Sequence, residues 1–205
     1  MNIVILHGLY MSSMVMKPLG ERLSALGHTT HLMNYSTTNI DADKLFREMD
    51  DALQETHNVL VGHSLGGLMI QRYLLSRDIS AEQASHVVTL GSPMQGASIV
   101  KIIEKIGMRG ILGNSVDFGL EPMDNIWGLP QKLGCIAGKI KVGFLPLFHG
   151  LKEASDGTVS VDETRIQGMQ DHVITSNTHL SLLYSDDVVS CIDYFINHDH
   201  FEHPE

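Results

Sequence analysis

The sequence predicts an α/β fold, a single domain with a mostly parallel sheet of about six strands and helices on both faces. Short apolar runs rich in β-branched residues alternate with segments whose apolar residues recur every three or four positions. This alternation is typical of βαβ units. The strand-like runs are apolar at nearly every position, as strands buried on both faces must be. A length of 205 residues fits one domain, 1–205.

The expected elements follow each other in a regular order along the chain. Six strands are expected, at residues 2–6, 29–33, 58–62, 86–90, 134–137 and 172–175. Four helices are expected between and after the strands. The first has Val15, Leu19, Leu23 and Leu26 on its apolar face, and Asp41 caps the second. The other two span residues 65–77 and 186–197. Gly27 stands where the first of these helices should end.

The segment 94–133 departs from this order. It joins the fourth and fifth strands through about forty positions, whereas a crossover needs only a dozen or so. We expect the crossover helix near residues 98–107. The remaining residues are rich in glycine and apolar side chains, and they form either a lid or cap insertion over a site or an irregular packed connection.

Composition excludes several classes of protein. The chain has 14 Lys and Arg against 24 Asp and Glu, a formal net charge of −10, which argues against nucleic-acid binding. Cys135 and Cys191 are too few and too far apart for a disulfide framework or a zinc site, so we expect reduced thiols. No basic leader precedes the first apolar run, and no stretch reaches the roughly 18 apolar residues of a membrane span. We therefore expect a cytoplasmic protein without a membrane anchor, metal or cofactor; the oligomeric state is open.

The strongest local signal is a glycine-flanked serine between an expected strand and an expected helix. Residues 62–67 read Gly-His-Ser-Leu-Gly-Gly, which places Ser64 at the centre of G-x-S-x-G. A strand that enters a helix without a loop must turn sharply, and the turn exposes the serine hydroxyl at the sheet edge. The flanking glycines are expected because larger side chains would collide with the neighbouring strand and helix. Ser64 is the candidate nucleophile.

A serine hydroxyl needs a base, and the base needs an orienting acid. His179 follows the sixth strand directly, at the end of the sheet where ligands bind in such folds. His86 and His172 instead open strands at the opposite end of the sheet. The acid is expected between the fifth and sixth strands, and Asp156 lies there in a Ser-Asp-Gly turn that can present its carboxylate. Asp156 and His179 are therefore the candidate acid and base.

Acyl transfer also requires two backbone N–H groups directed at the developing oxyanion. The N–H of Leu65, directly after the nucleophile, is one candidate. The other is the N–H of Leu9, in the loop that follows the first strand. His7, beside that loop, is given no acid–base role.

At these residues the sequence resembles the α/β-hydrolase superfamily, and within it the small lipase and esterase branch. The resemblance extends over essentially the whole chain, at His-Gly (7–8), Gly-His-Ser-Leu-Gly-Gly (62–67), Gly-Ser-Pro (91–93) with Gly96, Ser-Asp-Gly (155–157) and His179. It implies Ser64 as nucleophile, Asp156 as acid, His179 as base and an oxyanion hole at Leu9 and Leu65. The chain begins at what would be the family's third strand, so it resembles the minimal members that lack the antiparallel leader strands.

The predicted function is hydrolysis of carboxylic esters through an acyl-enzyme on Ser64, with a small-molecule or lipid-like acyl ester as substrate. A thioesterase, amidase or acyltransferase would use the same residues. A non-catalytic binding protein that keeps the fold is the alternative from a different class. The eleven methionines either form an adaptable acyl-binding surface or fill the core.

Overall fold

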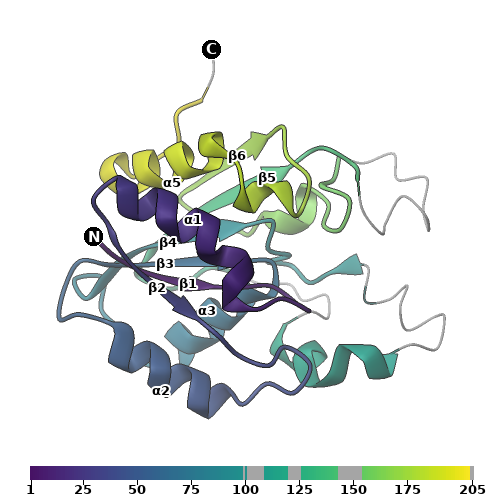
Figure 1. The fold of residues 1–205 in the computed structure, drawn as a ribbon, viewed down its shortest axis with the longest axis horizontal. Coiled ribbons are helices and arrows are strands. Elements are labelled where there is room, and N and C mark those ends of the chain that lie inside the picture. Colours follow the sequence, from purple (N-terminus) through teal and green to yellow (C-terminus); the bar gives the residue numbers. More distant parts are fainter. Residues whose placement is uncertain (99, 101–108, 120–125, 143–153, 204–205) are drawn as a thin grey trace.

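The α/β fold predicted from the sequence is present in a computed structural model, which describes residues 1–98, 100, 109–119, 126–142 and 154–203. Six strands form one sheet in the order β2-β1-β3-β4-β5-β6, and every pairing is parallel (Figure 1). The strands are β1 Asn2–Leu6, β2 Thr29–Met33, β3 Asn58–His63, β4 Ala84–Leu90, β5 Lys132–Gly138 and β6 Asp171–Thr175.

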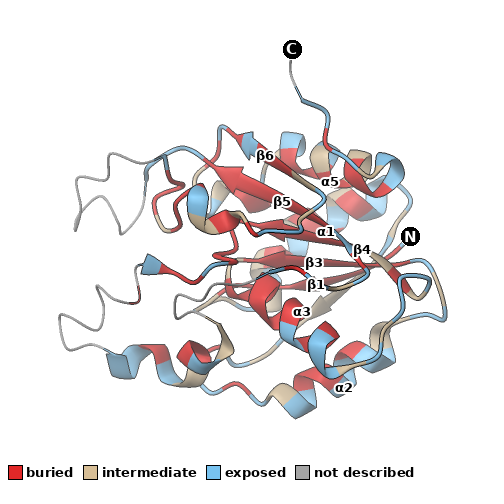
Figure 2. Cartoon of the chain, turned by 180° about the vertical axis from the view of Figure 1, so that it is seen from behind, coloured by how far each residue is buried: buried red, intermediate tan, exposed pale blue. Residues whose placement is uncertain are grey.

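Helices cover both faces of this sheet. The α-helices are α1 Ser13–Ala25, α2 Ala42–Ala52, α3 Leu65–Ser76 and α5 Asp186–His198, and the short 3-10 helices are η1 Arg109–Phe118, η3 Asp162–Thr164 and η4 Ser181–Leu183. Helices α1 and α5 lie on one face, and α2 and α3 lie on the other (Figures 1 and 2). As predicted, Asp41 caps α2, because its carboxylate accepts a hydrogen bond from the Lys44 N–H at 2.9 Å.

The fifth strand is longer than the predicted 134–137, because β5 runs from Lys132 to Gly138. Glycine has a low strand propensity, which disfavours Gly134 and Gly138 as strand residues. In the structure both are paired residues of β5. A Cβ on Gly134 would lie 2.8 Å from the rings of Phe195 and Phe201, and one on Gly138 would lie 2.5 Å from the Asn177 carbonyl oxygen. Glycine is tolerated in this strand because its neighbours already occupy the side-chain space.

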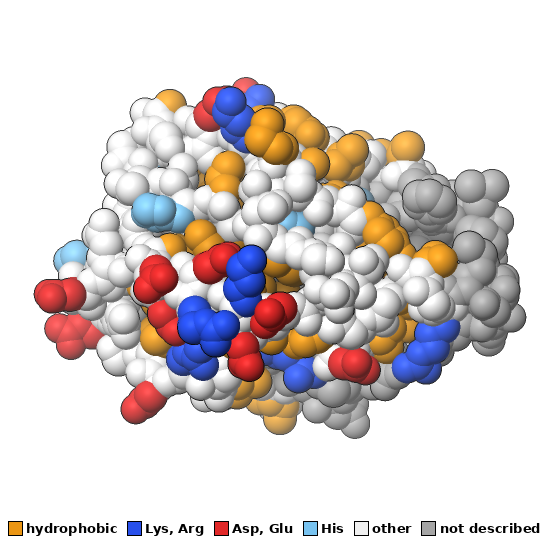
Figure 3. Space-filling view, turned by 60° about the horizontal axis from the view of Figure 1, so that its bottom comes forward, with side chains coloured by type: hydrophobic (Ala, Val, Ile, Leu, Met, Phe, Trp, Pro, Cys, Tyr) orange, Lys and Arg blue, Asp and Glu red, His pale blue; other side chains and the backbone are white. Residues whose placement is uncertain are grey.

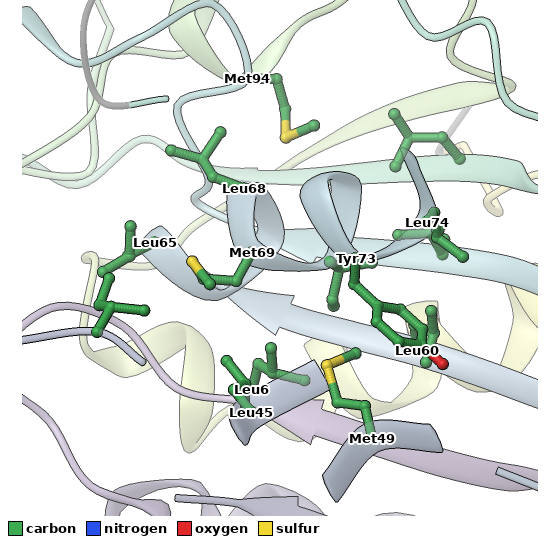
Figure 4. Packing of buried hydrophobic residues seen from close by; sticks show 14 of the residues in the cluster. Leu6, Leu45, Met49, Leu60, Leu65, Leu68, Met69, Tyr73, Leu74 and Met94 are labelled. Atoms are coloured by element: carbon green, nitrogen blue, oxygen red, sulfur yellow. The ribbon is translucent and has the colours of Figure 1, made fainter. Parts of the chain in front are cut away.

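The sheet separates two hydrophobic clusters. Leu19 of α1 and Phe195 of α5 are fully buried in the cluster on their face. On the other face Met49 of α2 and Tyr73 of α3 pack with Leu60 of β3, all fully buried (Figure 4). Burial of one such side chain stabilises the fold by about 1.5–3 kcal/mol. These two layers hold the strand ends rigidly, and the candidate site lies at those ends.

The surface is charged where the helices meet solvent. Acidic and basic side chains mix on the side of the molecule where α2 lies (Figure 3), and Arg77 pairs there with Asp50 at 3.1 Å. Both cysteines are free, as predicted; Cys135 is buried and Cys191 half-buried. Within the described residues, no helix is long and apolar enough to cross a membrane.

Candidate active site

Ser64 forms the turn between β3 and α3. Its backbone has φ 52° and ψ −120°, a positive-φ conformation that is strained for a residue with a side chain. Its N–H donates to the Leu90 carbonyl of the neighbouring strand at 2.9 Å, which holds the turn in place. The side chain is half-buried. The structure thus contains the strand–serine–helix arrangement that the G-x-S-x-G pattern predicts.

The glycines on either side of Ser64 are required by close backbone contacts. A Cβ on Gly62 would lie 2.5 Å from the backbone nitrogen of Gly67. A Cβ on Gly66 would lie 2.5 Å from the carbonyl oxygen of Leu6. Backbone atoms cannot move aside as the end of a flexible side chain can. The expectation that both positions need glycine is therefore confirmed.

Asp156 is a buried acid with a full set of hydrogen bonds. Only 1% of its surface is exposed. Its Oδ1 accepts the N–H groups of Thr158 and Val159 at 2.9 and 2.8 Å, which fixes the orientation of the carboxylate. Gly157 has φ +97° and allows the chain to fold back over the carboxylate. The other oxygen, Oδ2, is left for His179.

His179 lies in the loop between β6 and η4, and Asp156 holds it at two points. Its Nδ1 lies 2.7 Å from Asp156 Oδ2, and its backbone N–H donates to the Asp156 carbonyl at 2.9 Å. Because a carboxylate only accepts hydrogen bonds, Nδ1 carries the hydrogen, and Nε2 is left with its lone pair. The imidazole thus has the tautomer that a general base needs. Among the described residues, no hydrogen bond joins the Ser64 hydroxyl to His179.

Two further residues lie against the Asp156–His179 pair, and the sequence pattern predicts a role for neither. Gly91 follows β4 with φ +56°, and a Cβ there would lie 2.8 Å from Asp156 Oδ2 and 3.1 Å from His179 Nδ1. The glycine directly after an apolar strand is the signal that could have located this contact. The second residue is His63, whose ring centroid lies 4.6 Å from that of His179.

The loop after β1 orients the backbone N–H of Leu9. The Gly8 carbonyl accepts hydrogen bonds from His7 Nδ1 at 3.0 Å and from the Met11 N–H at 3.3 Å. The C=O and N–H of one planar peptide point in opposite directions, so fixing the Gly8 oxygen also fixes the Leu9 N–H. Tyr35 supports the loop by donating its hydroxyl hydrogen to the His7 carbonyl at 2.7 Å. Burial lowers the pKa of His7, which keeps its ring neutral.

The two candidate oxyanion donors come from different elements. Leu65 is the first residue of α3, and an N–H in the first turn of a helix has no acceptor within the helix. Leu9 has no hydrogen-bond acceptor for its N–H among the described residues. A Cβ on Gly8 would lie 2.9 Å from Ser64 Cβ, so the loop of Leu9 approaches the serine closely. Glycine at position 8 permits this approach.

Part of the segment 94–133 is held firmly against the rest of the fold. Asn114 in η1 donates to the Ile40 carbonyl at 2.9 Å and accepts from the Ile40 N–H at 2.7 Å. The Tyr10 hydroxyl donates to the Ile111 carbonyl at 2.7 Å, which ties η1 to the loop that carries Leu9. The expected crossover helix near 98–107 lies almost entirely outside the described residues. The lid interpretation stays a prediction.

A cavity of about 510 Å³ opens between α2, α3 and the residues after β4. Leu68, one turn along α3 from Ser64, lines it together with Phe46, Leu75, Met94 and Phe118. Most of these side chains are apolar, and Arg72 contributes a charge. Within the described part of the chain, no group of three or more His, Cys, Asp or Glu side chains is arranged to hold a metal ion.

Known structures share this fold at low sequence identity. A lipase from Bacillus licheniformis, solved in its propeptide form, aligns with a TM-score of 0.72 and 17% identity over 100% of this chain and 52% of the lipase. The chain therefore spans about half the length of that lipase. The pyrethroid hydrolase PytH aligns with a TM-score of 0.66 and 13% identity over 97% of this chain and 98% of that one. An esterase from a Rhodococcus species aligns with a TM-score of 0.59 and 13% identity over 96% of this chain and 90% of the esterase.

Sequence comparison identifies the family. No curated protein sequence matches the chain significantly. A family model described as a PGAP1-like alpha/beta domain matches residues 4–106, about half of the chain, from β1 through the serine turn and past β4. Together with the six-stranded parallel sheet and its structural neighbours, this match leads to one conclusion. The chain belongs to the PGAP1-like alpha/beta domain family and has the fold of the α/β-hydrolase superfamily.

Proposed function

We propose that this protein is a serine hydrolase that cleaves carboxylic esters through an acyl-enzyme on Ser64. The observation that carries the proposal is the pair of the buried Asp156 and the half-buried His179, joined at 2.7 Å, at the same sheet end as a strained, half-buried serine. Lipases and esterases among the structural neighbours support an ester as substrate. A static pair without a substrate is often looser than the reacting complex, so a Ser64–His179 hydrogen bond would form on substrate binding.

The first half of the reaction forms the acyl-enzyme. His179 Nε2 takes the proton of the Ser64 hydroxyl as Oγ bonds to the ester carbonyl carbon. The carbonyl oxygen becomes an oxyanion, which the N–H groups of Leu9 and Leu65 would stabilise; each such donor typically contributes about 10²–10³ in rate. Asp156 stabilises the imidazolium. The intermediate then expels the alkoxide, which receives the proton from His179 and leaves as the alcohol.

The second half releases the acid. Water loses a proton to His179 as its oxygen bonds to the acyl carbon, which regenerates the oxyanion. The bond from Ser64 Oγ to the acyl carbon then breaks, and the serine recovers its proton from His179. The products are one carboxylic acid and one alcohol, and the enzyme returns to its starting state.

Covalent labelling tests the nucleophile directly. A fluorophosphonate should react with the wild-type protein at Ser64, located by mass spectrometry of the digested adduct. Ser64→Ala should lose both labelling and hydrolysis of p-nitrophenyl esters of short and medium chain length, with unchanged thermal unfolding. Ser176→Ala is the matched control, because Ser176 is exposed just beyond β6 near the same sheet end and should behave as wild type. No adduct, or one at another residue, would exclude the proposed mechanism.

We assign the acyl chain of the substrate to the apolar cavity that Leu68 lines, one helical turn from Ser64; none of Ser64, Asp156 and His179 itself lines this cavity. Leu75 lines the cavity and is 68% exposed, so Leu75→Trp would fill space there without disturbing the core. The variant should shift the preference among p-nitrophenyl esters toward shorter chains. An unchanged chain-length profile would remove the cavity from the proposal and leave the chemistry at Ser64 intact.

A further inference from the structure

His63 is a fully buried histidine directly before the candidate nucleophile, at the end of β3. Its Nε2 lies 3.0 Å from the backbone carbonyl oxygen of His179, 116 residues further along the chain. A carbonyl only accepts hydrogen bonds, so Nε2 must carry the hydrogen and donate it. The two rings lie at an interplanar angle of 47°, with their centroids 4.6 Å apart. His63 thus connects the loop of the base to the turn of the nucleophile.

The other ring nitrogen of His63 faces the loop that carries Leu9. Nδ1 is buried without a hydrogen-bond partner among the described residues. A Cβ on Gly8 would lie 2.9 Å from it. Burial, reinforced by His179 and His7 nearby, holds the pKa of His63 well below its usual value. The ring therefore stays neutral, with its single N–H hydrogen committed to the His179 carbonyl.

The loop of His179 is fixed by hydrogen bonds from two directions. Asp156 binds its N–H and its Nδ1, and His63 binds its carbonyl. Asp156 thus holds the N–H and ring of His179, and the bond from His63 anchors the carbonyl end of the same residue to β3. A neutral donor does so without adding a charge that would repel the imidazolium formed during catalysis.

We propose that His63 is a positioning residue: its Nε2–H holds the His179 backbone so that the free Nε2 of His179 faces the Ser64 hydroxyl. This role rests on the proposed function, since it concerns the same base and nucleophile. It assigns His63 no proton transfer and no contact with substrate. A histidine that served only to fill the core would give the same burial, so the two roles must be separated by measurement.

Two variant pairs separate positioning from packing. His63→Phe keeps a ring but has no donor, whereas His63→Gln can place an amide N–H near the position of Nε2. We expect His63→Phe to lower kcat by about 10- to 100-fold with KM within about twofold, as misplaced catalytic groups do. His63→Gln should recover most of that kcat. Equal losses in both variants, or a loss in KM alone, would overturn the proposal.

A second pair covers the case in which His63→Phe does not fold. Asn and Gln carry the same amide, but Asn is one methylene shorter and does not reach the His179 carbonyl. His63→Asn should therefore lose kcat while His63→Gln retains it. Equal activity in these two variants would contradict the positioning role. His172→Gln is the matched control and should keep wild-type kcat. His172 is also buried, and its Nδ1 has no partner in the described part of the chain, but it lies near the start of β6.

One readout does not depend on any substrate. In protein labelled with ¹⁵N-histidine, the Nδ1 hydrogen that His179 shares with Asp156 should give a low-field NMR signal. His63→Phe or His63→Asn should shift or broaden it, and His63→Gln should preserve it. An unchanged signal in the variants without a donor would exclude positioning even if the wild-type protein cleaves esters. If the wild-type protein neither cleaves esters nor takes a phosphonate, the proposed function fails while this test of His63 still stands.

Discussion

Histidine–aspartate pairs lie at both ends of the parallel sheet, and they differ in what surrounds them. At the carboxyl end of the strands, Asp156 is 1% exposed and bonds to His179 at 2.7 Å. At the amino end, His86 is the third residue of β4 and bonds at 2.9 Å to Asp199, whose side chain is 46% exposed. The distances are nearly equal. A histidine–aspartate pair alone therefore does not indicate a catalytic site. The proposed site differs from the amino-end pair in having a buried acid and a strained serine turn at the same end of the sheet.

At the amino end of the strands, the polar contacts attach α5 and the residues that follow it to the sheet. His28 before β2 bonds to Asp193 of α5 at 2.9 Å. Asp171 of β6 accepts hydrogen bonds from the Phe201 N–H at 2.7 Å and from His203 at 3.0 Å. Each contact joins residues distant in sequence. The His86 ring also bonds to the Ser85 hydroxyl at 2.8 Å, but Ser85 lies within β4 and not in a strained turn like that of Ser64. We therefore expect substitutions here to change stability, and those at the carboxyl end to change activity.

The largest expected effect is the loss of activity in Asp156→Asn. The amide would no longer hold His179 in the tautomer that leaves Nε2 free, so kcat should fall by about 10⁴-fold. Asp171→Asn is the matched control at the amino end; its kcat should stay within about twofold of wild type. Ester hydrolysis by both variants measures the difference. Comparable losses would mean that the two ends do not differ as described.

A backbone clash at the carboxyl end should give the largest loss of stability. In Gly62→Ala the new methyl group would lie 2.5 Å from the backbone nitrogen of Gly67, and neither segment can yield without displacing β3 or α3. We expect the free energy of unfolding to fall by about 3 kcal/mol or more. Gly128→Ala is the control, since nothing lies within 4 Å of a Cβ there. Urea unfolding of both variants checks this, and equal stability would contradict the clash.

These two predictions rest on features that the sequence predicted with different success. The apolar run at residues 2–6 located β1 to the residue, because a strand buried on both faces is apolar almost throughout. The bounds of β2 are also as predicted, although its residues are exposed or half-buried. The serine turn and His179 are predicted because their residue types follow expected strands, and Asp156 because it lies in a Ser-Asp-Gly turn between the fifth and sixth strands. The contacts of His63 and Gly91 with His179 are not predicted, because they join residues far apart in the chain and leave no local pattern.

The segment after β4 shows a second limit of sequence patterns. Helix η1 has no strong apolar period, and its placement depends on the Asn114–Ile40 amide pairing with a loop 74 residues earlier. A Cβ on Gly113 would collide with the Thr38 carbonyl. Such tertiary hydrogen bonds determine the conformation in place of local propensity.

An intermediate effect is expected from His172, which parallels His63 at the opposite end of the sheet. Burial, reinforced by Arg165, lowers the pKa of His172 from 6.5 to about 4. The unfolded chain therefore binds a proton at His172 more readily than the folded chain does. The stability that the neutral, buried His172 contributes is complete above pH 6.5 and is lost as the pH falls toward 4. Between pH 7 and pH 5 the loss should be about 2 kcal/mol.

His172→Gln isolates that contribution. The amide keeps a donor for Thr164 Oγ1, which His172 Nε2 contacts at 2.9 Å, but it does not titrate. Urea unfolding at pH 7 and pH 5 gives the free energy of unfolding of each protein. Its decrease between the two pH values should be smaller in the variant than in wild type by about the same 2 kcal/mol. An identical drop in both proteins would assign the acid sensitivity to other groups, among them His63 at the carboxyl end.

The smallest effect is expected at Asp199, the exposed counterpart of Asp156. Asp199 follows α5 with φ +68°, a conformation that asparagine also tolerates, so Asp199→Asn changes the charge without straining the backbone. The carboxylate bonds to His86 and to Lys132 Nζ at 2.5 Å, and exposed pairs of this kind contribute about 0.2–1 kcal/mol. Urea unfolding should show a loss in that range that shrinks at high salt, with unchanged kcat. A fall in kcat near that of Asp156→Asn would show that an exposed pair at the amino end shapes the active site, and the contrast between the two ends would no longer hold.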